Sequence, residues 1–267
     1  MTEPECFEVF AVRYGRVERR AIENFIGGDP HDGPMPLDYF VWAARGPETT
    51  WVIDTGFNPA AAERRGRTLL RSPAEGLALL GIEAARVADV IITHLHYDHA
   101  GNFDLFPRAT FHLQDLEMAY ATGRYMAHGA LRAAYDEDDV IGMVRRVYAG
   151  RVRFHDGDAE LKPGISLHRI GGHTRGMQVV RVWTRRGWVV LASDASHFYA
   201  NMEQGRPYPN VFNVGDMIEG YAILRRLADS PAHIVPGHDP LVMARYPEPS
   251  ADLAGIAVRL DVAPTGA

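Results

Sequence analysis

The feature that most constrains this chain is a cluster of three histidines and one aspartate directly after an apolar run. The run is Val90-Ile91-Ile92, and the cluster lies in His94-Leu95-His96-Tyr97-Asp98-His99. A β-branched run of this kind indicates a buried strand, so the cluster begins where a strand ends. Imidazoles and carboxylates this crowded cannot all satisfy one another by hydrogen bonds. A divalent metal ion can satisfy them, and zinc is the usual metal at nitrogen-rich sites.

The spacing of the cluster is rare. The chain has 12 histidines in 267 residues. A His-x-His-x-Asp-His string would then arise by chance in about two of a thousand chains of this length. Solvated loop histidines are therefore a poor explanation, and metal binding is favoured. Metal sites draw ligands from several segments, so further ligands are expected elsewhere in the chain.

Three more candidate ligands each follow a strand-like segment and have glycine or another small residue beside them. They are His173, Asp194 and His238. Small neighbours permit the sharp turn that such a position needs. Taken alone, either histidine has an ordinary alternative as a loop residue, and Asp194 could cap a helix that begins near Ser196. Together with the first cluster, all three are better explained as ligands.

In the order and position of these residues the chain resembles the metallo-β-lactamase superfamily, from about residue 50 to residue 240. The matching residues are Asp54-Thr55-Gly56, the cluster from His94 to His99, His173, Asp194 and His238. The resemblance implies a complete two-metal site. Its first metal would take His94, His96 and His173, its second Asp98, His99 and His238, with Asp194 bridging both.

The resemblance also implies the fold. The superfamily fold is an αββα sandwich, an α+β arrangement of two mixed β-sheets packed face to face with helices on both outer faces. We expect one such domain over residues 1–267. The strand-like and helix-like segments by themselves support only a mixed α/β class. Helices are expected over residues 58–66, 73–80, 114–121, 129–135, 137–148 and 214–227.

Within the superfamily, the sequence from His94 to Asn102 is most similar to the N-acyl-homoserine lactone lactonases. This resemblance implies that the chain opens a lactone ring. Two divalent ions about 3.5–4 Å apart can share a water and generate a bridging hydroxide that attacks the carbonyl. Asp98 is then the expected proton shuttle to the leaving oxygen. Zinc is the expected metal, with iron, cobalt or manganese as alternatives, and Asp54 is expected to orient a ligand histidine.

One position departs from the lactonase pattern. Many lactonases carry a tyrosine three residues after the bridging aspartate, where its phenol donates to the substrate carbonyl. Here that position is His197, with Tyr199 two residues further on. We expect either His197 or Tyr199 to replace the missing donor. The alternative is that His197 is simply the first turn of a helix, without a role.

Several other functions share the metal motif. A hydrolase of another lactone, ester or thioester is the first alternative, and an iron-dependent redox member of the superfamily is the second. A glyoxalase II-type thioesterase carries a helical domain after its last ligand histidine, whereas only 29 residues follow His238 (267 minus 238). A non-catalytic binding protein would be expected to lack some ligands. A β-lactamase would act outside the cytoplasm.

Composition narrows the partners. The net charge of −6 disfavours nucleic acid. No apolar stretch approaches the roughly 20 residues that span a bilayer. The acidic N-terminus has no signal-peptide pattern, so a cytoplasmic location is expected. The single cysteine, Cys6, excludes an internal disulfide. The expected partner is a small-molecule lactone or ester, and a homodimer is left open.

Two segments are candidates for shaping the substrate site. Residues 26–36 are rich in glycine and proline and form either a lid or a passive surface connection. Residues 120–148 form a helical segment that we expect to line the substrate entrance. Core packing is the alternative for the apolar residues of that segment.

Overall fold

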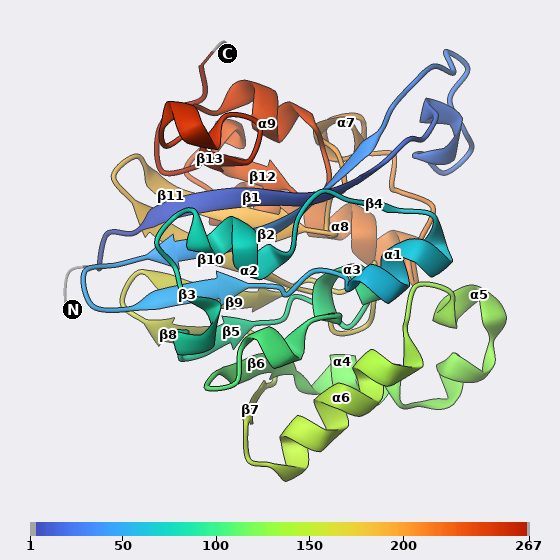
Figure 1. Cartoon of the computed structure of the whole chain (residues 1–267). Helices are drawn as coiled ribbons and strands as arrows, with labels where there is room; N and C mark the ends of the chain where they lie inside the picture. Colours follow the sequence, from blue (N-terminus) through green and yellow to red (C-terminus); the bar gives the residue numbers. More distant parts are fainter. Residues whose placement is uncertain (1–3, 266–267) are drawn as a thin grey trace.

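Two β-sheets pack face to face, with helices on their outer faces (Figure 1). The computed structural model describes residues 4–265. In that range the larger sheet has the strand order β13-β1-β2-β3-β5-β6-β7, with β4 paired to β1, and the smaller sheet has the order β12-β11-β10-β9-β8. The expected αββα sandwich is confirmed.

The strands of the larger sheet are β1 (Glu8–Val17), β2 (Leu37–Arg45), β3 (Thr50–Ile53), β4 (Thr68–Leu69), β5 (Asp89–Ile91), β6 (Thr110–Gln114), β7 (Val152–His155) and β13 (Ala257–Arg259). Those of the smaller sheet are β8 (Ala159–Lys162), β9 (Ile165–Arg169), β10 (Gln178–Thr184), β11 (Gly187–Ser193) and β12 (Ile234–Pro236). The α-helices are α1 (Pro59–Arg65), α2 (Pro73–Ala78), α3 (Tyr97–Ala100), α4 (Asp115–Ala121), α5 (Gly129–Arg132), α6 (Glu137–Tyr148), α7 (Tyr199–Gln204), α8 (Val214–Leu227) and α9 (Leu241–Arg245).

The alternation of side chains along β1 explains the layers. Val9 and Ala11 belong to the core that the two sheets share. Phe10 and Val12 belong to the second core, between the larger sheet and the helices outside it. Successive side chains of a strand point to opposite faces, so an almost unbroken apolar strand is buried on both sides. Each fully buried side chain of this size contributes about 1.5–3 kcal/mol.

The direction of the strands brings the carboxyl ends of several strands to one edge of the fold. In the larger sheet β3, β5, β6 and β7 run parallel, and in the smaller sheet β11 and β12 run parallel. Parallel strands bring their carboxyl ends to one edge of the sheet, where open α/β sheets bind their ligands. The sharp turns that follow these strands therefore present their side chains to a common region.

Helix boundaries differ from the sequence expectation by three residues in two places and by at most two residues elsewhere. The helix expected near Ser196 begins only at Tyr199, because the chain from Asp194 to Phe198 forms a turn rather than helix. The helix expected over 129–135 ends at Arg132. Tyr135 lies instead in an isolated bridge with His96. None of the helices in residues 4–265 has the length and apolarity needed to cross a membrane.

Candidate metal centre

All seven predicted metal ligands lie together at the carboxyl ends of the strands. His94 and His96 follow β5, Asp98 and His99 lie in the short helix α3, His173 follows β9, Asp194 follows β11, and His238 follows β12. Every one of them is buried, with Asp98 the most exposed at 8%. Buried ionisable groups in such numbers require a partner for each polar atom.

The first ligand group surrounds one oxygen of Asp194. His96 Nδ1 lies 3.0 Å from His94 Nε2 and 2.9 Å from His173 Nε2. Asp194 Oδ2 lies 3.2 Å from His173 Nε2 and 3.8 Å from His94 Nε2. These four atoms converge on one point.

The second ligand group surrounds the other oxygen of Asp194. Asp194 Oδ1 lies 2.9 Å from His238 Nε2 and 3.2 Å from His99 Nε2. Asp98 Oδ2 lies 3.8 Å from His99 Nε2 and 3.9 Å from His238 Nε2. One carboxylate is therefore shared by two clusters of histidine nitrogens.

The donor set fits divalent metal ions. Ligand atoms around a tetrahedral zinc ion, with Zn–N distances of about 2.0–2.1 Å, lie about 3.3 Å apart. The separations of 2.9–3.8 Å in the first group are close to that value. In addition, the buried Nε2 of His99 has no hydrogen-bond partner among the described residues. A cation would satisfy these converging lone pairs.

Other groups fix which nitrogen of each histidine faces the centre. His173 Nδ1 lies 2.7 Å from the carbonyl oxygen of Asn210, and His238 Nδ1 lies 3.0 Å from that of Asp38. A carbonyl only accepts, so each Nδ1 donates and each Nε2 keeps a free lone pair. Asp54 Oδ2 lies 2.7 Å from His99 Nδ1 and acts in the same way. The predicted supporting position of Asp54 therefore matches its geometry.

Two residues beside the centre hold a strained backbone. Asp54 has φ 63° and Ser193 has φ 44°, both in the left-handed region. Such residues cost on the order of 1–3 kcal/mol and persist where the surroundings hold them. Thr93 provides that hold, because its hydroxyl lies 2.8 Å from Asp54 Oδ2 and 3.0 Å from Ser193 Oγ. Thr93 thus ties the two sheets together next to His94.

Glycines allow the ligand turns to form. A Cβ on Gly237, the residue before His238, would lie 2.6 Å from Ser193 O and 2.9 Å from Asp194 Oδ1. Contacts that short require the backbone to shift, so only glycine fits between the two ligand loops.

Burial and neighbouring charges put His94, His96 and Asp194 in the protonation states that metal binding requires. Burial, reinforced by the neighbouring histidines, holds the pKa of His94 and that of His96 well below the usual value. Burial alone would raise the pKa of Asp194. The histidines around it, first His197 and then His238, nevertheless hold that pKa well below its usual value. Neutral imidazole and ionised carboxylate are the forms that bind metals.

His197 lies at the centre, and the alternative that placed it in the first turn of a helix is wrong. It precedes α7 rather than forming its first turn. Its Nε2 lies 3.0 Å from Asp194 Oδ2, and its ring stacks on Tyr208 at 3.7 Å. Burial lowers the pKa of His197 to about 3. A neutral imidazole carries one N–H, so His197 can donate a hydrogen bond from only one of its two ring nitrogens.

Tyr199 does not reach the metal ligands. As the first residue of α7 it turns to the other side, where its ring packs against the Arg245 guanidinium at 4.0 Å and lines a separate cavity with Tyr246. Tyr208, which sequence reasoning missed, lines the cleft beside the candidate metal ligands instead. No pattern in the sequence marks Tyr208, because it is brought to His197 by the loop after α7.

Glu117 is a second residue that sequence reasoning missed. This buried carboxylate accepts from Leu95 N at 2.9 Å, Tyr135 Oη at 2.9 Å, Thr174 Oγ1 at 2.6 Å and Gly176 N at 3.2 Å. Leu95 lies between His94 and His96, and Thr174 follows His173. Glu117 therefore joins two ligand loops. The sequence offered one signal for this residue: Glu117 lies in the first turn of the helix that follows the parallel strand β6.

The ligands open onto a cleft of about 380 Å³. Its walls include His96, Asp98, Asp194 and His238 of the centre, and Ala130, Ala133 and Ala134 of the predicted entrance segment. None of residues 26–36 lines it, although Leu37 does. The segment containing residues 26–36 projects beyond the sheets (Figure 1), which favours the surface-connection alternative over the lid.

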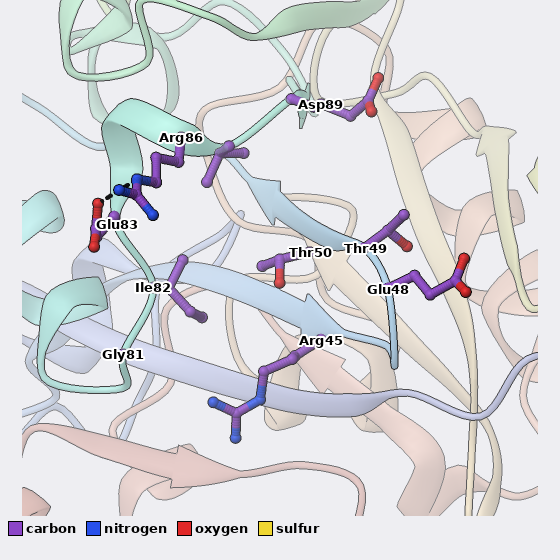
Figure 2. A pocket seen from close by; sticks show the side chains of 11 residues that line it. Arg45, Glu48, Thr49, Thr50, Gly81, Ile82, Glu83, Arg86 and Asp89 are labelled. Carbon is purple, nitrogen blue, oxygen red and sulfur yellow. Dashed lines mark ion pairs between the residues drawn. The ribbon is translucent and has the colours of Figure 1, made fainter.

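A hollow of similar size, about 350 Å³, lies at the opposite ends of the same strands. Figure 2 shows its charged side chains: Glu83 and Arg86 form an ion pair of 2.8 Å, while Arg45, Glu48 and Asp89 lie apart from one another. No group of metal-ligating atoms converges there among residues 4–265. The hollow therefore lacks the donor set of the cleft.

The fold and the centre place this chain in a known class. The model of the metallo-β-lactamase superfamily matches residues 35–238, and the chain belongs to that superfamily. The matched range contains all seven ligands.

Comparisons with individual proteins give finer likenesses. The N-acyl homoserine lactonase AiiB of Agrobacterium fabrum is 29% identical over 174 residues, which cover 58% of this chain and 61% of that protein. The match thus spans about three fifths of the relative's length. A solved quorum-quenching N-acyl homoserine lactone lactonase has a TM-score of 0.74 at 22% identity, covering 90% of this chain and 95% of that chain. AidC, a dizinc quorum-quenching lactonase, has a TM-score of 0.67 at 17% identity, covering 90% of both chains.

Proposed function

We propose that this protein is a hydrolase that uses two divalent metal ions, zinc foremost, to open a lactone ring, with N-acyl-homoserine lactones as the favoured substrates. The observation that carries the proposal is the shared carboxylate of Asp194, which has histidine nitrogens at 2.9 and 3.2 Å from Oδ1 and at 3.2 Å from Oδ2. A bridging position of this kind suits two ions rather than one. The likeness to proteins named as lactonases supports the substrate class.

The chain's own residues divide the remaining tasks. When bound, the metal ions would supply an activated water and Lewis acidity toward a carbonyl oxygen. Asp98 lines the cleft and belongs to the second ligand group, so it is placed to accept a proton and pass it to the leaving oxygen. His197 Nε2, at 3.0 Å from Asp194 Oδ2, donates to that carboxylate and orients it. We therefore assign His197 to positioning Asp194 rather than to contacting the substrate.

Two substitutions test this proposal. Replacing His173 by Ala removes a ligand, and Asp98→Asn removes the proton acceptor while keeping the shape. We expect each to lower the opening of homoserine lactones by about a thousandfold or more. The measurement is acid release across short-chain and long-chain homoserine lactones, other lactones and thioesters. Metal is counted by elemental analysis.

Matched controls are His31→Ala and Asp104→Asn, since both residues are exposed and distant from the cleft. These controls should retain wild-type rates and metal content. The proposal fails if purified protein holds well under one transition metal per chain after supplementation. It also fails if Asp98→Asn or His173→Ala releases acid at the wild-type rate.

A further inference from the structure

We propose that the cleft binds substrates that carry an anionic group, a carboxylate or a phosphate, at an arginine wall formed by Arg65 and Arg67. Both side chains line the cleft together with Asp98 and His238. The inference rests on the proposed function in one respect, because it takes this cleft as the place where substrate binds. It narrows the substrate class to lactones, N-acyl-homoserine lactones among them, whose substituent carries an anion, whereas a simple N-acyl-homoserine lactone carries no charge.

The first element of the wall, Arg67, is held with part of its guanidinium free. Its Nε donates to the Tyr97 hydroxyl at 3.0 Å, and its Nη1 donates to the carbonyl of Arg65 at 2.8 Å. Within residues 4–265, its Nη2 has no hydrogen-bond acceptor. Two anchored nitrogens fix the plane of the group and leave a donor edge for a ligand.

The second element, Arg65, is fixed beside it. Its Nη1 and Nη2 donate to the carbonyls of Ala133 at 2.8 Å and Tyr135 at 3.0 Å. Its guanidinium carbon lies 4.0 Å from the centre of the Tyr97 ring. The two guanidinium groups therefore share one aromatic support, and little side-chain freedom is lost when a ligand binds them.

The charge of this wall has no paired carboxylate among the described residues. Against the effect of burial, Asp98 raises the pKa of Arg67 only from beyond ion-pair distance. Some arginines elsewhere in the chain have carboxylate partners, such as Arg13 with Asp38 at 3.1 Å and Arg45 with Glu8 at 2.8 Å. Arg64, next in the chain to Arg65, pairs with Asp136. Neither Arg65 nor Arg67 has a carboxylate within 4.0 Å in the described part of the chain. The carboxylates that line the cleft, Asp98 and Asp194, are assigned to the metal ions.

The third arginine of the cleft, Arg19, differs from these two. It lies 3.9 Å from Glu23 Oε1, and its Nε donates to Asn24 at 2.9 Å. Glu23 neutralises part of the charge of Arg19, so we do not include Arg19 in the arginine wall.

Guanidinium groups of this kind recognise carboxylate and phosphate oxygens by paired hydrogen bonds. In a chain of net charge −6, a pair of uncompensated arginines in the cleft selects for an anion locally. The Tyr97 hydroxyl, which accepts from Arg67, lies 3.1 Å from the Tyr39 hydroxyl, and the Tyr39 ring lies 5.2 Å from that of His238. The wall is thus separated from the metal ligands by two tyrosines. It would contact a distal group of the substrate rather than the reacting carbonyl.

The test compares a charged lactone with its neutral twin on the metal-loaded protein. The probes are N-succinyl-homoserine lactone, whose carboxylate lies at the far end of the acyl chain, and the corresponding succinamide, which has nearly the same shape without the charge. We expect kcat/KM to be at least about tenfold higher for the carboxylate, equivalent to about 1.4 kcal/mol. In the double variant Arg65→Gln/Arg67→Gln this ratio should fall toward one, mainly through KM. The single variant Arg67→Lys, which keeps the charge, should retain part of this ratio. The matched control is Arg64→Gln, which should keep the wild-type ratio.

A binding measurement separates this inference from the proposed function. Calorimetry with glutarate, inorganic phosphate and neutral glutaramide detects the arginine wall even if no lactone is opened. Binding of either anion that weakens about tenfold in the double variant, but not in Arg64→Gln, supports the wall, and the tighter anion identifies its preference. Anion binding that is unchanged in the double variant would place the anions on the metal ions and overturn the inference. A wild-type enzyme that favours the carboxamide would overturn it as well.

Discussion

The two ends of the parallel strands in the larger sheet carry hollows of nearly equal size, about 380 Å³ at the carboxyl ends and about 350 Å³ at the amino ends. Only the first has converging donors. At the carboxyl ends the backbone turns sharply away and leaves side chains aimed inward. At the amino ends the charged side chains of Figure 2 lie mostly apart. Size alone therefore does not make a site.

The difference also lies in the support behind the side chains. His99, His173 and His238 each have a fixed partner on the nitrogen that faces away from the centre, such as the carbonyl oxygen of Asn210 behind His173. In the amino-end hollow, Asp89 contacts one histidine, His112, at 3.0 Å. Convergence needs several chain segments held by buried hydrogen bonds, and the centre has them from both sheets.

The largest expected difference between the two hollows comes from replacing one aspartate by asparagine in each of them. Asp194→Asn removes the carboxylate shared by both ligand groups, so bound metal should fall from two ions to one or fewer. Lactone opening should fall about a thousandfold or more. Asp89→Asn in the other hollow should change neither by more than about twofold. Elemental analysis and initial rates measure both. Equal losses in the two variants would show that the hollows do not differ as described.

A smaller effect is expected from the support of the ligand loops. Glu117→Ala leaves four buried donors without an acceptor, which should cost about 3 kcal/mol of the free energy of unfolding. Metal affinity should fall about 10–100-fold, as for other groups that orient ligands. Glu117→Gln keeps an acceptor oxygen and should recover part of both losses. The exposed Glu63→Ala is the control. Denaturant unfolding and metal titration provide the measurements. A loss of stability without any change in metal affinity would limit Glu117 to a packing role.

The smallest effect is expected at His155, the last residue of β7, which stacks on His112, the histidine that Asp89 of the amino-end hollow contacts. Burial, with the nearby His112 and Arg153, lowers the pKa of His155 from 6.5 to about 4. Between these values the folded chain binds fewer protons at His155 than the unfolded chain. The free energy of unfolding therefore falls as pH falls from about 6.5 to about 4.

His155→Gln removes that contribution, so the melting temperature of the variant should gain on the wild type as pH falls through this window. The comparison is made by thermal unfolding of wild type, His155→Gln and the exposed His31→Gln at several pH values. Parallel pH profiles for wild type and His155→Gln would contradict the assignment.

Much of the centre was predictable because its ligands follow strand-like runs at short spacing. His94, His96, Asp98 and His99 lie in one segment, and the remaining ligands each follow a further apolar run beside a small residue. The position of Asp54 at a strand end was also foreseeable. Glu117 and Tyr208 were not, because nothing local marks a residue whose partners lie on other segments. Tyr199 shows the opposite error: its nearness to Asp194 in sequence suggested a site residue, yet the start of α7 turns it away.

The sequence by itself determined which donor atoms are available to bind a metal, since residue types and local spacing fix them. It also determined the alternation that buries β1 and its neighbours on both faces. The tertiary structure decided which nitrogen of each histidine faces inward, which phenol lines the cleft, and that Arg65 and Arg67 lack acidic partners. These outcomes depend on contacts between segments far apart in the chain, such as Glu117 with Leu95 and Thr174. Such contacts depend on the packing of the whole molecule, which short-range patterns do not encode.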